Sequence, residues 1–193
     1  DRDVFGFYRQ GVSVSIALLY VRKGILGGSR RFFLDDPYGD DQAILSQVLK
    51  QLYDESNAPP AELLLPHDFE DRAVMAERLS DLSERTITLS VAQRGEPREL
   101  VRMASTNAKQ LFDEQQNKER SWLDLAGNMQ KKHQLPVPPH RIECLDISNI
   151  SGTLAVGSLV TFNSGEPEPK RYRHYRIKTV KGPDDYAMMR EVI

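Results

Sequence analysis

A short segment near the start of the chain sets the strongest limit on the fold. In residues 12–21, apolar side chains alternate with small ones, and towards the end both faces of the expected strand become apolar. Such a pattern is typical of a central strand that is covered on both sides. The segment therefore predicts a strand in the middle of a sheet that is packed on both faces.

The segments around it supply the other elements of such a sheet. Apolar side chains at Ile44, Leu45, Val48, Leu49 and Leu52 fall at helical spacing, and Asp40 and Asp41 offer a helix start. The predicted order of elements is β-β-β-α-β-α-β. The expected strands lie at residues 3–9, 12–21, 25–34, 61–66 and 86–91, and the expected helices lie at residues 40–52 and 71–83.

The same pattern begins again at Arg141 and stops after one helix. We expect Tyr186, Met189, Val192 and Ile193 to share a face of that helix, which the "GPDDY" segment caps. This context favours helix capping over metal binding for Asp184 and Asp185. The expected elements are strands at residues 141–147, 153–162 and 170–178, and a helix after residue 184.

A polar, helix-prone stretch connects the two patterns. It carries a thin apolar stripe, so it is either one or two helices lying across both units or a solvated helical linker. The predicted organisation is a first unit at residues 1–95, a helical linker at 96–139 and a second unit at 140–193. The stripe consists of Leu100, Ala104, Ala108, Leu111 and Phe112.

Composition excludes several classes of protein. No apolar run is long enough to span a bilayer, so we expect a cytoplasmic protein with no membrane partner. A single cysteine, Cys144, excludes an internal disulfide and a cysteine-built zinc site, and we expect it to be a small apolar strand residue. The formal net charge is -2, so a polyanion site must come from local clusters of Lys and Arg. The two ends of the sequence lead us to expect an excerpt of a longer polypeptide.

Asp146 is the most informative polar residue, because it lies in "RIECLDISN", which otherwise predicts a buried strand. An ionised carboxylate taken out of water costs several kcal/mol unless it is paired, hydrogen-bonded or bound to a cation. Alternation places Asp146 on the same face as Ile142, Cys144 and Ser148. It is therefore either a strand-end aspartate that caps a loop or a residue that holds something.

Four segments carry a resemblance to a known family: "RIECLDISN", "VGSLVTF", "YRHYRIKTVKGPDDYAMMREV" and "VAQRGEPRELVRMASTNA". They closely resemble UvrC, the endonuclease subunit of bacterial nucleotide excision repair, and the resemblance runs along essentially the whole chain. It implies a mixed α/β, ribonuclease H-like fold. One complete, inactive unit would be followed by a helical linker and by the start of the catalytic endonuclease domain.

The resemblance also implies a chemistry. Asp146 matches the carboxylate on the first strand of ribonuclease H-like nucleases, which is both a catalytic residue and a ligand of Mg²⁺ or Mn²⁺. Laying Val4 on Ile142 puts Tyr8 opposite Asp146, so we expect the first unit to lack this carboxylate. The family's other catalytic residues lie beyond Ile193, so the excerpt alone should be inactive. The implied role is incision of damaged double-stranded DNA on the 5′ side of a lesion, with UvrB and the UvrA-UvrB pathway as partners.

A basic segment without acidic residues follows the second expected strand of the second unit. Together with its interleaved aromatic side chains it predicts a DNA contact, and the alternative is a solvated edge strand guarded by charge. The alternative function for the whole excerpt is a non-catalytic scaffold that docks UvrB or other domains of the same chain. The predicted DNA-binding residues are Lys170, Arg171, Arg173, Arg176, Lys178 and Lys181.

Overall fold

The computed structural model describes residues 1–150, 153–180, 182 and 184–193. It divides into two compact units, residues 1–116 and residues 117–193. None of the helices in these described ranges combines the length and the apolar character needed to cross a bilayer. The architecture is mixed α/β, as predicted: a five-stranded sheet with helices, a long helix and a second, smaller sheet.

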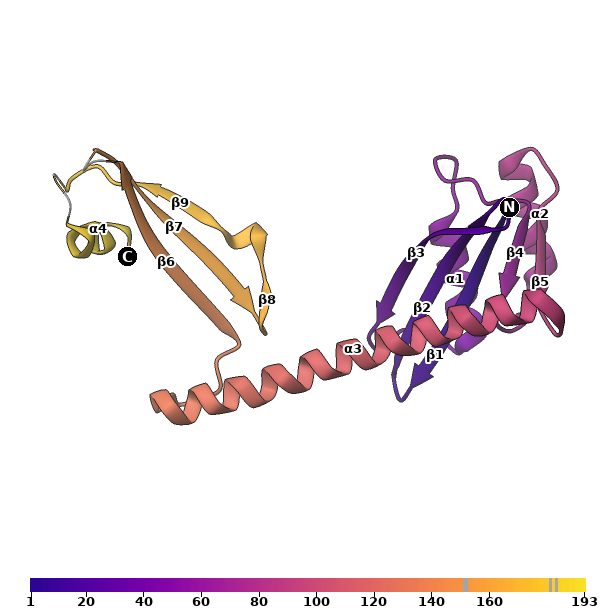
Figure 1. The fold of residues 1–193 in the computed structure, drawn as a ribbon, viewed down its shortest axis with the longest axis horizontal. Helices are drawn as coiled ribbons and strands as arrows, with labels where there is room; N and C mark the ends of the chain where they lie inside the picture. Colours follow the sequence, from indigo (N-terminus) through magenta and orange to yellow (C-terminus); the bar gives the residue numbers. More distant parts are fainter. Residues whose placement is uncertain (151–152, 181, 183) are drawn as a thin grey trace. The chain divides into compact units, whose positions relative to one another are not determined.

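A five-stranded mixed sheet forms the centre of the first unit (Figure 1). Its strands occur in the predicted order along the chain. They are β1 (Arg2–Gln10), β2 (Ser13–Arg22), β3 (Ile25–Leu34), β4 (Glu62–Leu65) and β5 (Thr88–Val91). The order across the sheet is β3-β2-β1-β4-β5, with antiparallel pairs between the first three strands and parallel pairs at β1–β4 and β4–β5.

Helices cover both faces of this sheet, which confirms the prediction made from residues 12–21. They are α1 (Asp41–Leu52), α2 (Arg72–Ser83) and α3 (Gly95–His133). Buried side chains of α1 and α2 pack with Phe5 and Ile16 on one face, whereas Val101 and Ala104 of α3 pack with Val4 and Leu19 on the other. The predicted start of α1 is also confirmed, because the Asp40 side chain accepts a hydrogen bond from the backbone N–H of Ala43 at 2.8 Å.

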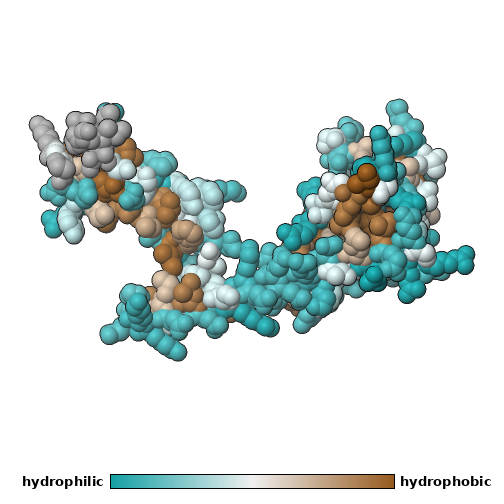
Figure 2. Space-filling view, viewed as in Figure 1, coloured by the Kyte–Doolittle hydropathy of each residue, from teal (hydrophilic) through white to brown (hydrophobic). Residues whose placement is uncertain are grey.

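The first part of α3 belongs to the core of the first unit. Its Ala104 and Ala108 are fully buried, and the hydroxyl of Ser15 donates to the carbonyl oxygen of Ala108 at 2.6 Å. At Gly6 of β1, an added Cβ would lie only 2.0 Å from the backbone carbon of Ala104. The alternative of a solvated linker is therefore wrong for this part of the helix, although its exposed side is mostly hydrophilic (Figure 2).

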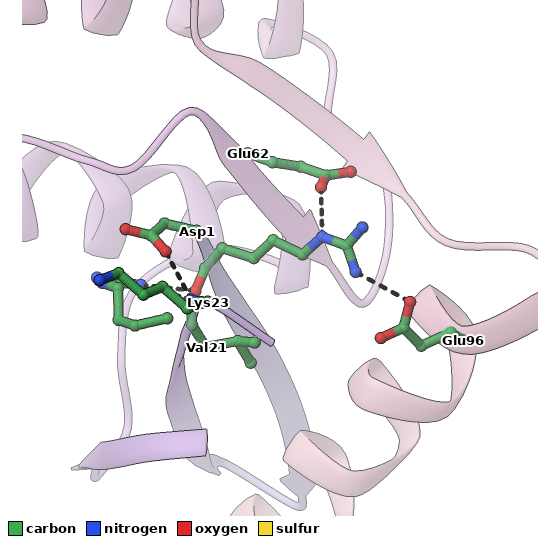
Figure 3. A network of polar contacts seen from close by, with 7 residues as sticks. Asp1, Val21, Lys23, Glu62 and Glu96 are labelled. Atoms are coloured by element: carbon green, nitrogen blue, oxygen red, sulfur yellow. Dashed lines mark hydrogen bonds and ion pairs between the residues drawn. The ribbon is translucent and has the colours of Figure 1, made fainter. Parts of the chain in front are cut away.

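Arg2 joins three elements at the start of the first sheet. Its Nε donates to Glu62 of β4 at 2.7 Å and its Nη1 donates to Glu96 of α3 at 3.2 Å. Figure 3 shows the two carboxylates on either side of the guanidinium. The hydrogen bond to Glu96, followed by the charge of Glu62, raises the pKa of Arg2 above its ordinary value. All three side chains are partly exposed, so each ion pair stabilises the unit by only ~0.2–1 kcal/mol.

The second unit contains a smaller sheet and a short helix. The third strand is shorter than the predicted residues 170–178: it starts later, because Pro169–Arg171 form a 3-10 turn, and it ends at Arg176. The elements are β6 (Arg141–Ile150), β7 (Thr153–Asn163), β8 (Glu166–Pro167), η1 (Pro169–Arg171), β9 (Arg173–Arg176) and α4 (Asp185–Val192). Strand β7 is central and pairs antiparallel with β6, β8 and β9.

The buried face of α4 differs from the predicted one. Met188 is the buried residue of this helix, whereas Tyr186 and Ile193 are 84% and 97% exposed. The helix packs on the sheet at Gly157 of β7, where an added Cβ would lie 3.0 Å from a methyl carbon of Val192. Tyr186 and Ile193 therefore do not belong to the covered face, whereas Val192 of the predicted face lies against the sheet and Met189 is half-buried.

Candidate functional site

Asp146 lies in β6 and its side chain is exposed. Cys144 and Ser148, which alternation places on the same face, are exposed as well. The prediction of a buried strand is therefore wrong, because α4 packs on the other face, against Leu145, Ile147 and Gly157. A water-exposed carboxylate needs no buried partner, so the desolvation argument does not apply to Asp146 in this structure.

The pairing of the strands places two further polar side chains beside Asp146. Asp146 is opposite Ser158 of β7, and Ser158 is opposite His174 of β9. Residues directly opposite one another in adjacent strands point to the same side of a sheet. We call this side the Asp146 face and define it by Asp146, Ser158, His174 and Arg176, the last two being alternate residues of β9.

The Asp146 carboxylate can supply one ligand to a hard divalent cation, which prefers oxygen atoms. Within the described ranges, no three His, Cys, Asp or Glu side chains gather closely enough to hold a metal ion. The carboxylate therefore fits the chemistry of a magnesium or manganese site as one ligand, and these residues do not complete such a site.

The basic segment surrounds β9, and its described members are all exposed. Two of them make local contacts: Arg171 pairs with Glu168 at 3.0 Å, and Arg173 donates to the carbonyl oxygens of Lys170 and Tyr172 at 3.0 and 2.8 Å. Arg176 has no ion-pair partner among the residues that the structure describes. Lys181 lies outside the described residues. The described members are Lys170, Arg171, Arg173, Arg176 and Lys178.

Carboxylates of α4 have structural roles. Asp184 accepts a hydrogen bond from the backbone N–H of Ala187 at 3.0 Å, so its predicted role as a helix cap is confirmed. Glu191 accepts backbone N–H groups of Lys178 and Thr179 at 2.7 and 3.0 Å. Its bond with the Thr179 hydroxyl, followed by the N–H of Lys178, lowers the pKa of Glu191 below its ordinary value. Glu191 thus fixes the basic segment after β9 to the helix.

Two family models match the chain. One, described as "UvrC Ribonuclease H-like domain", matches residues 1–115, and the other, "UvrC RNAse H endonuclease domain", matches residues 130–193. The chain belongs to the UvrC family. Proteins named "UvrABC system protein C" match all of it: that of Desulfotalea psychrophila is 49% identical, and that of Citrifermentans bemidjiense is 41% identical. The chain spans about a third of the length of these relatives, 32% and 31% respectively.

The two UvrC units can be compared through their first hairpins. The last paired residue of the first strand is Gln10 in one hairpin and Ile150 in the other, and Gly6 and Asp146 each lie four residues before it. Each also lies on the sheet face that is not covered by the next helix: Gly6 faces away from α1, and Asp146 faces away from α4. Counted along the first strand of each hairpin, Gly6 rather than Tyr8 corresponds to Asp146, although the register of the second hairpin shifts between Ser148 and Ile150. The first unit carries no carboxylate at either Gly6 or Tyr8.

A second carboxylate, Asp3, is buried at the start of β1 in the first UvrC unit, and sequence reasoning did not single it out. It is 2% exposed, accepts a hydrogen bond from the Tyr53 hydroxyl at 2.6 Å, and lies 2.7 Å from Nη1 of Arg22. That Nη1 donates its hydrogen bonds to the carbonyl oxygens of Arg2 and Val21, so its contact with Asp3 is mainly one of charge. Asp3 is therefore a structural residue.

Ser158 was missed as a candidate site residue, and His174 was included only among the interleaved aromatic side chains of the basic segment. The signal was present, because His174 and Arg176 are two residues apart in a predicted strand and must share a face. What the sequence could not supply is the register of β9 on β7, which brings His174 rather than its neighbours level with Asp146.

Proposed function

We propose that the chain is the central region of a UvrC-type excision endonuclease that contributes to metal-dependent 5′ incision of damaged DNA. In this proposal residues 1–95 form the inactive unit, residues 96–139 the helical linker and residues 140–193 the start of the endonuclease domain. The observation that carries the proposal is the placement of Asp146, an exposed carboxylate on an open sheet face within the segment that matches the UvrC endonuclease domain.

Asp146 would act as a metal ligand held rigidly by its strand. A bound Mg²⁺ or Mn²⁺ would polarise a phosphate oxygen and activate water for attack on the phosphodiester. The backbone of β6 fixes the carboxylate, because Leu145 and Ile147 on either side of it pack towards α4. The remaining ligands would come from parts of the protein outside these 193 residues, so we expect the chain alone to be inactive.

The charge distribution supports DNA as the substrate. Residues 117–193 contain 12 Lys and Arg against 9 Asp and Glu, whereas residues 1–116 contain 14 against 19. The excess of positive charge thus lies in the unit that carries Asp146. Exposed Lys and Arg neutralise phosphates and release counterions, which provides most of the sequence-independent affinity for DNA. The proposed partners are damaged double-stranded DNA and, through the longer protein, UvrB and the UvrA-UvrB pathway in the cytoplasm.

The test compares two isosteric substitutions in a protein extended to the full length of its relatives. Asp146→Asn should reduce 5′ incision of a damaged duplex in the presence of Mn²⁺ by at least ~100-fold, because it removes a charged metal ligand. Glu143→Gln, which neutralises an exposed carboxylate on the opposite face of the same strand, should cut normally. Normal incision by Asp146→Asn, with unchanged circular dichroism, would overturn the proposal.

A scaffold function is the second candidate for the first unit. It is favoured by the cover that α3 provides over Gly6, where the second unit carries its carboxylate. The edge strand β3 presents Ile25 and Leu26, which are 70% and 51% exposed, as a docking surface for UvrB or for another domain. Replacing both by Ser should weaken binding of the full-length protein to UvrB in a pull-down. Unchanged binding and unchanged incision would argue against this function.

A further inference from the structure

A row of polar side chains crosses the second sheet at the level of Asp146. It runs from Asp146 in β6 through Ser158 in β7 to His174 in β9. Neighbouring strands are about 4.8 Å apart, so the backbone of His174 lies about 10 Å from that of Asp146. His174 therefore lies on the same face as Asp146, two strands away from it.

The ring of His174 is held by its neighbour in the row. The Ser158 hydroxyl lies 3.2 Å from Nδ1 of His174, whereas the rest of this exposed side chain faces solvent. When the hydroxyl donates to Nδ1, the proton of the neutral imidazole is on Nε2, and in the imidazolium Nε2 also carries a proton. Nε2 is thus a hydrogen-bond donor whenever the hydroxyl donates to Nδ1 or the ring is protonated, and the contact with Ser158 orients the ring.

Arg176 lies on the same face, one alternate residue along β9. It is opposite Val156, and Val156 is opposite Ser148 on the Asp146 side of β6. Arg173 and Tyr175 point to the other face, because Tyr175 is opposite Gly157, which lies under Val192. The basic segment is thus divided by the pleat of the strand, and only part of it faces a substrate that is bound at Asp146.

We propose that His174 and Arg176 bind phosphate oxygens of the DNA strand whose scissile phosphate is held at Asp146, with Ser158 as the positioning residue for the imidazole. The inference deepens the proposed function and rests on it. Arg176 supplies a planar, permanently charged donor pair suited to phosphate, and His174 supplies a single oriented N–H.

The experiment uses the full-length protein and a fluorescent damaged duplex, with affinity measured without divalent metal and incision measured with Mn²⁺. His174→Ala and Arg176→Ala should each weaken affinity about tenfold, the effect of one charge-assisted hydrogen bond. Arg190→Ala is the matched control, because it removes an exposed positive charge from α4, on the other side of the sheet, and should change affinity less than about twofold.

Restoring DNA affinity with a conservative substitution distinguishes a hydrogen-bond donor at His174 from a purely structural role of its side chain. His174→Gln keeps an N–H donor near the position of Nε2 and should restore affinity to within about twofold of the parent. Ser158→Ala should weaken affinity in the presence of His174 and have no further effect on the His174→Ala protein.

The two proposals fail in different ways. If the His174 and Arg176 variants bind and cut like Arg190→Ala while Asp146→Asn is inactive, the inference about these residues is wrong and the proposed function stands. If Asp146→Asn is active, the proposed function itself is wrong.

Discussion

Asp3 shows how a single charged residue is accommodated inside a sheet. Its carboxylate is almost fully buried, but the Tyr53 hydroxyl donates to one oxygen and Arg22 lies beside the other. Tyr53 in turn belongs to the core cluster beneath α1 and contacts Phe5 edge-on. Removing either partner would leave a buried charge without compensation, which costs more than the same contact contributes when it is complete.

Replacing Tyr53 by Phe tests this arrangement. The ring remains and the hydroxyl is lost, so we expect the free energy of unfolding of the first unit to fall by about 1.5–3 kcal/mol, the value for a hydrogen bond to a charged group. Urea unfolding followed by circular dichroism would measure the loss. The control is Tyr38→Phe, because Tyr38 is 98% exposed and should leave the unfolding midpoint unchanged. An equal midpoint for both variants would contradict the role given to the hydroxyl.

The same residue predicts a dependence on pH. Burial, followed by the charge of Asp3, raises the pKa of Tyr53 above its ordinary value. The folded unit therefore holds the phenol proton above pH ~10, where the unfolded chain releases it, so stability is complete below that pH and falls as pH rises. We expect a loss of about 1.4 kcal/mol per pH unit above pH ~10 that the Tyr53→Phe variant lacks. The free energy of unfolding is measured by urea titration at several pH values. An equal fall with pH above ~10 for the parent and the Tyr53→Phe variant would exclude this contribution.

Among the elements, α3 shows most clearly what the sequence could and could not predict. Helical spacing of Leu100, Ala104 and Leu111 predicts its apolar stripe, because that periodicity is local. The sheet residue it covers could not be predicted, because Gly6 looks like any glycine in a strand until the helix backbone is placed against it. The same holds for β6, whose apolar pattern predicts a strand but not which of its faces is covered.

The close approach of α3 to β1 makes Gly6 the most demanding position of the first unit. In Gly6→Ala, the new Cβ would lie 2.0–2.2 Å from backbone atoms of Ala104 and Ser105, so the helix must move off the sheet. We expect destabilisation of at least ~1–3 kcal/mol, measured as a lower urea midpoint. Gly27→Ala in β3 is the control, because its nearest atom would be 3.9 Å away, and it should unfold like the parent. Equal urea midpoints for Gly6→Ala and Gly27→Ala would show that α3 can move off the sheet without loss of stability.

For the whole molecule, the unequal division of charge predicts where DNA binds. The first unit carries an excess of acidic residues and the second an excess of basic ones, so pairs of basic residues in the two units should differ in their effect on affinity. The pair Arg30 and Arg31 in β3 and the pair Lys170 and Arg176 around β9 are all exposed, which makes them comparable. Comparing the two pairs tests which unit binds DNA, rather than the role of any single residue.

The measurement is the slope of log K for DNA binding against the logarithm of the salt concentration, in the full-length protein. Each phosphate that the protein neutralises adds about 0.9 to the magnitude of this slope. Replacing Lys170 and Arg176 by Ala should reduce this slope by about 1.8, because two phosphate contacts are lost. Replacing Arg30 and Arg31 by Ala should leave the slope unchanged, since one of them is already paired with Glu114 at 3.1 Å and both lie in the acidic unit. Equal slopes for the two double variants would show that DNA is not bound through the second unit in particular, and the basic segment would then be a solvated edge.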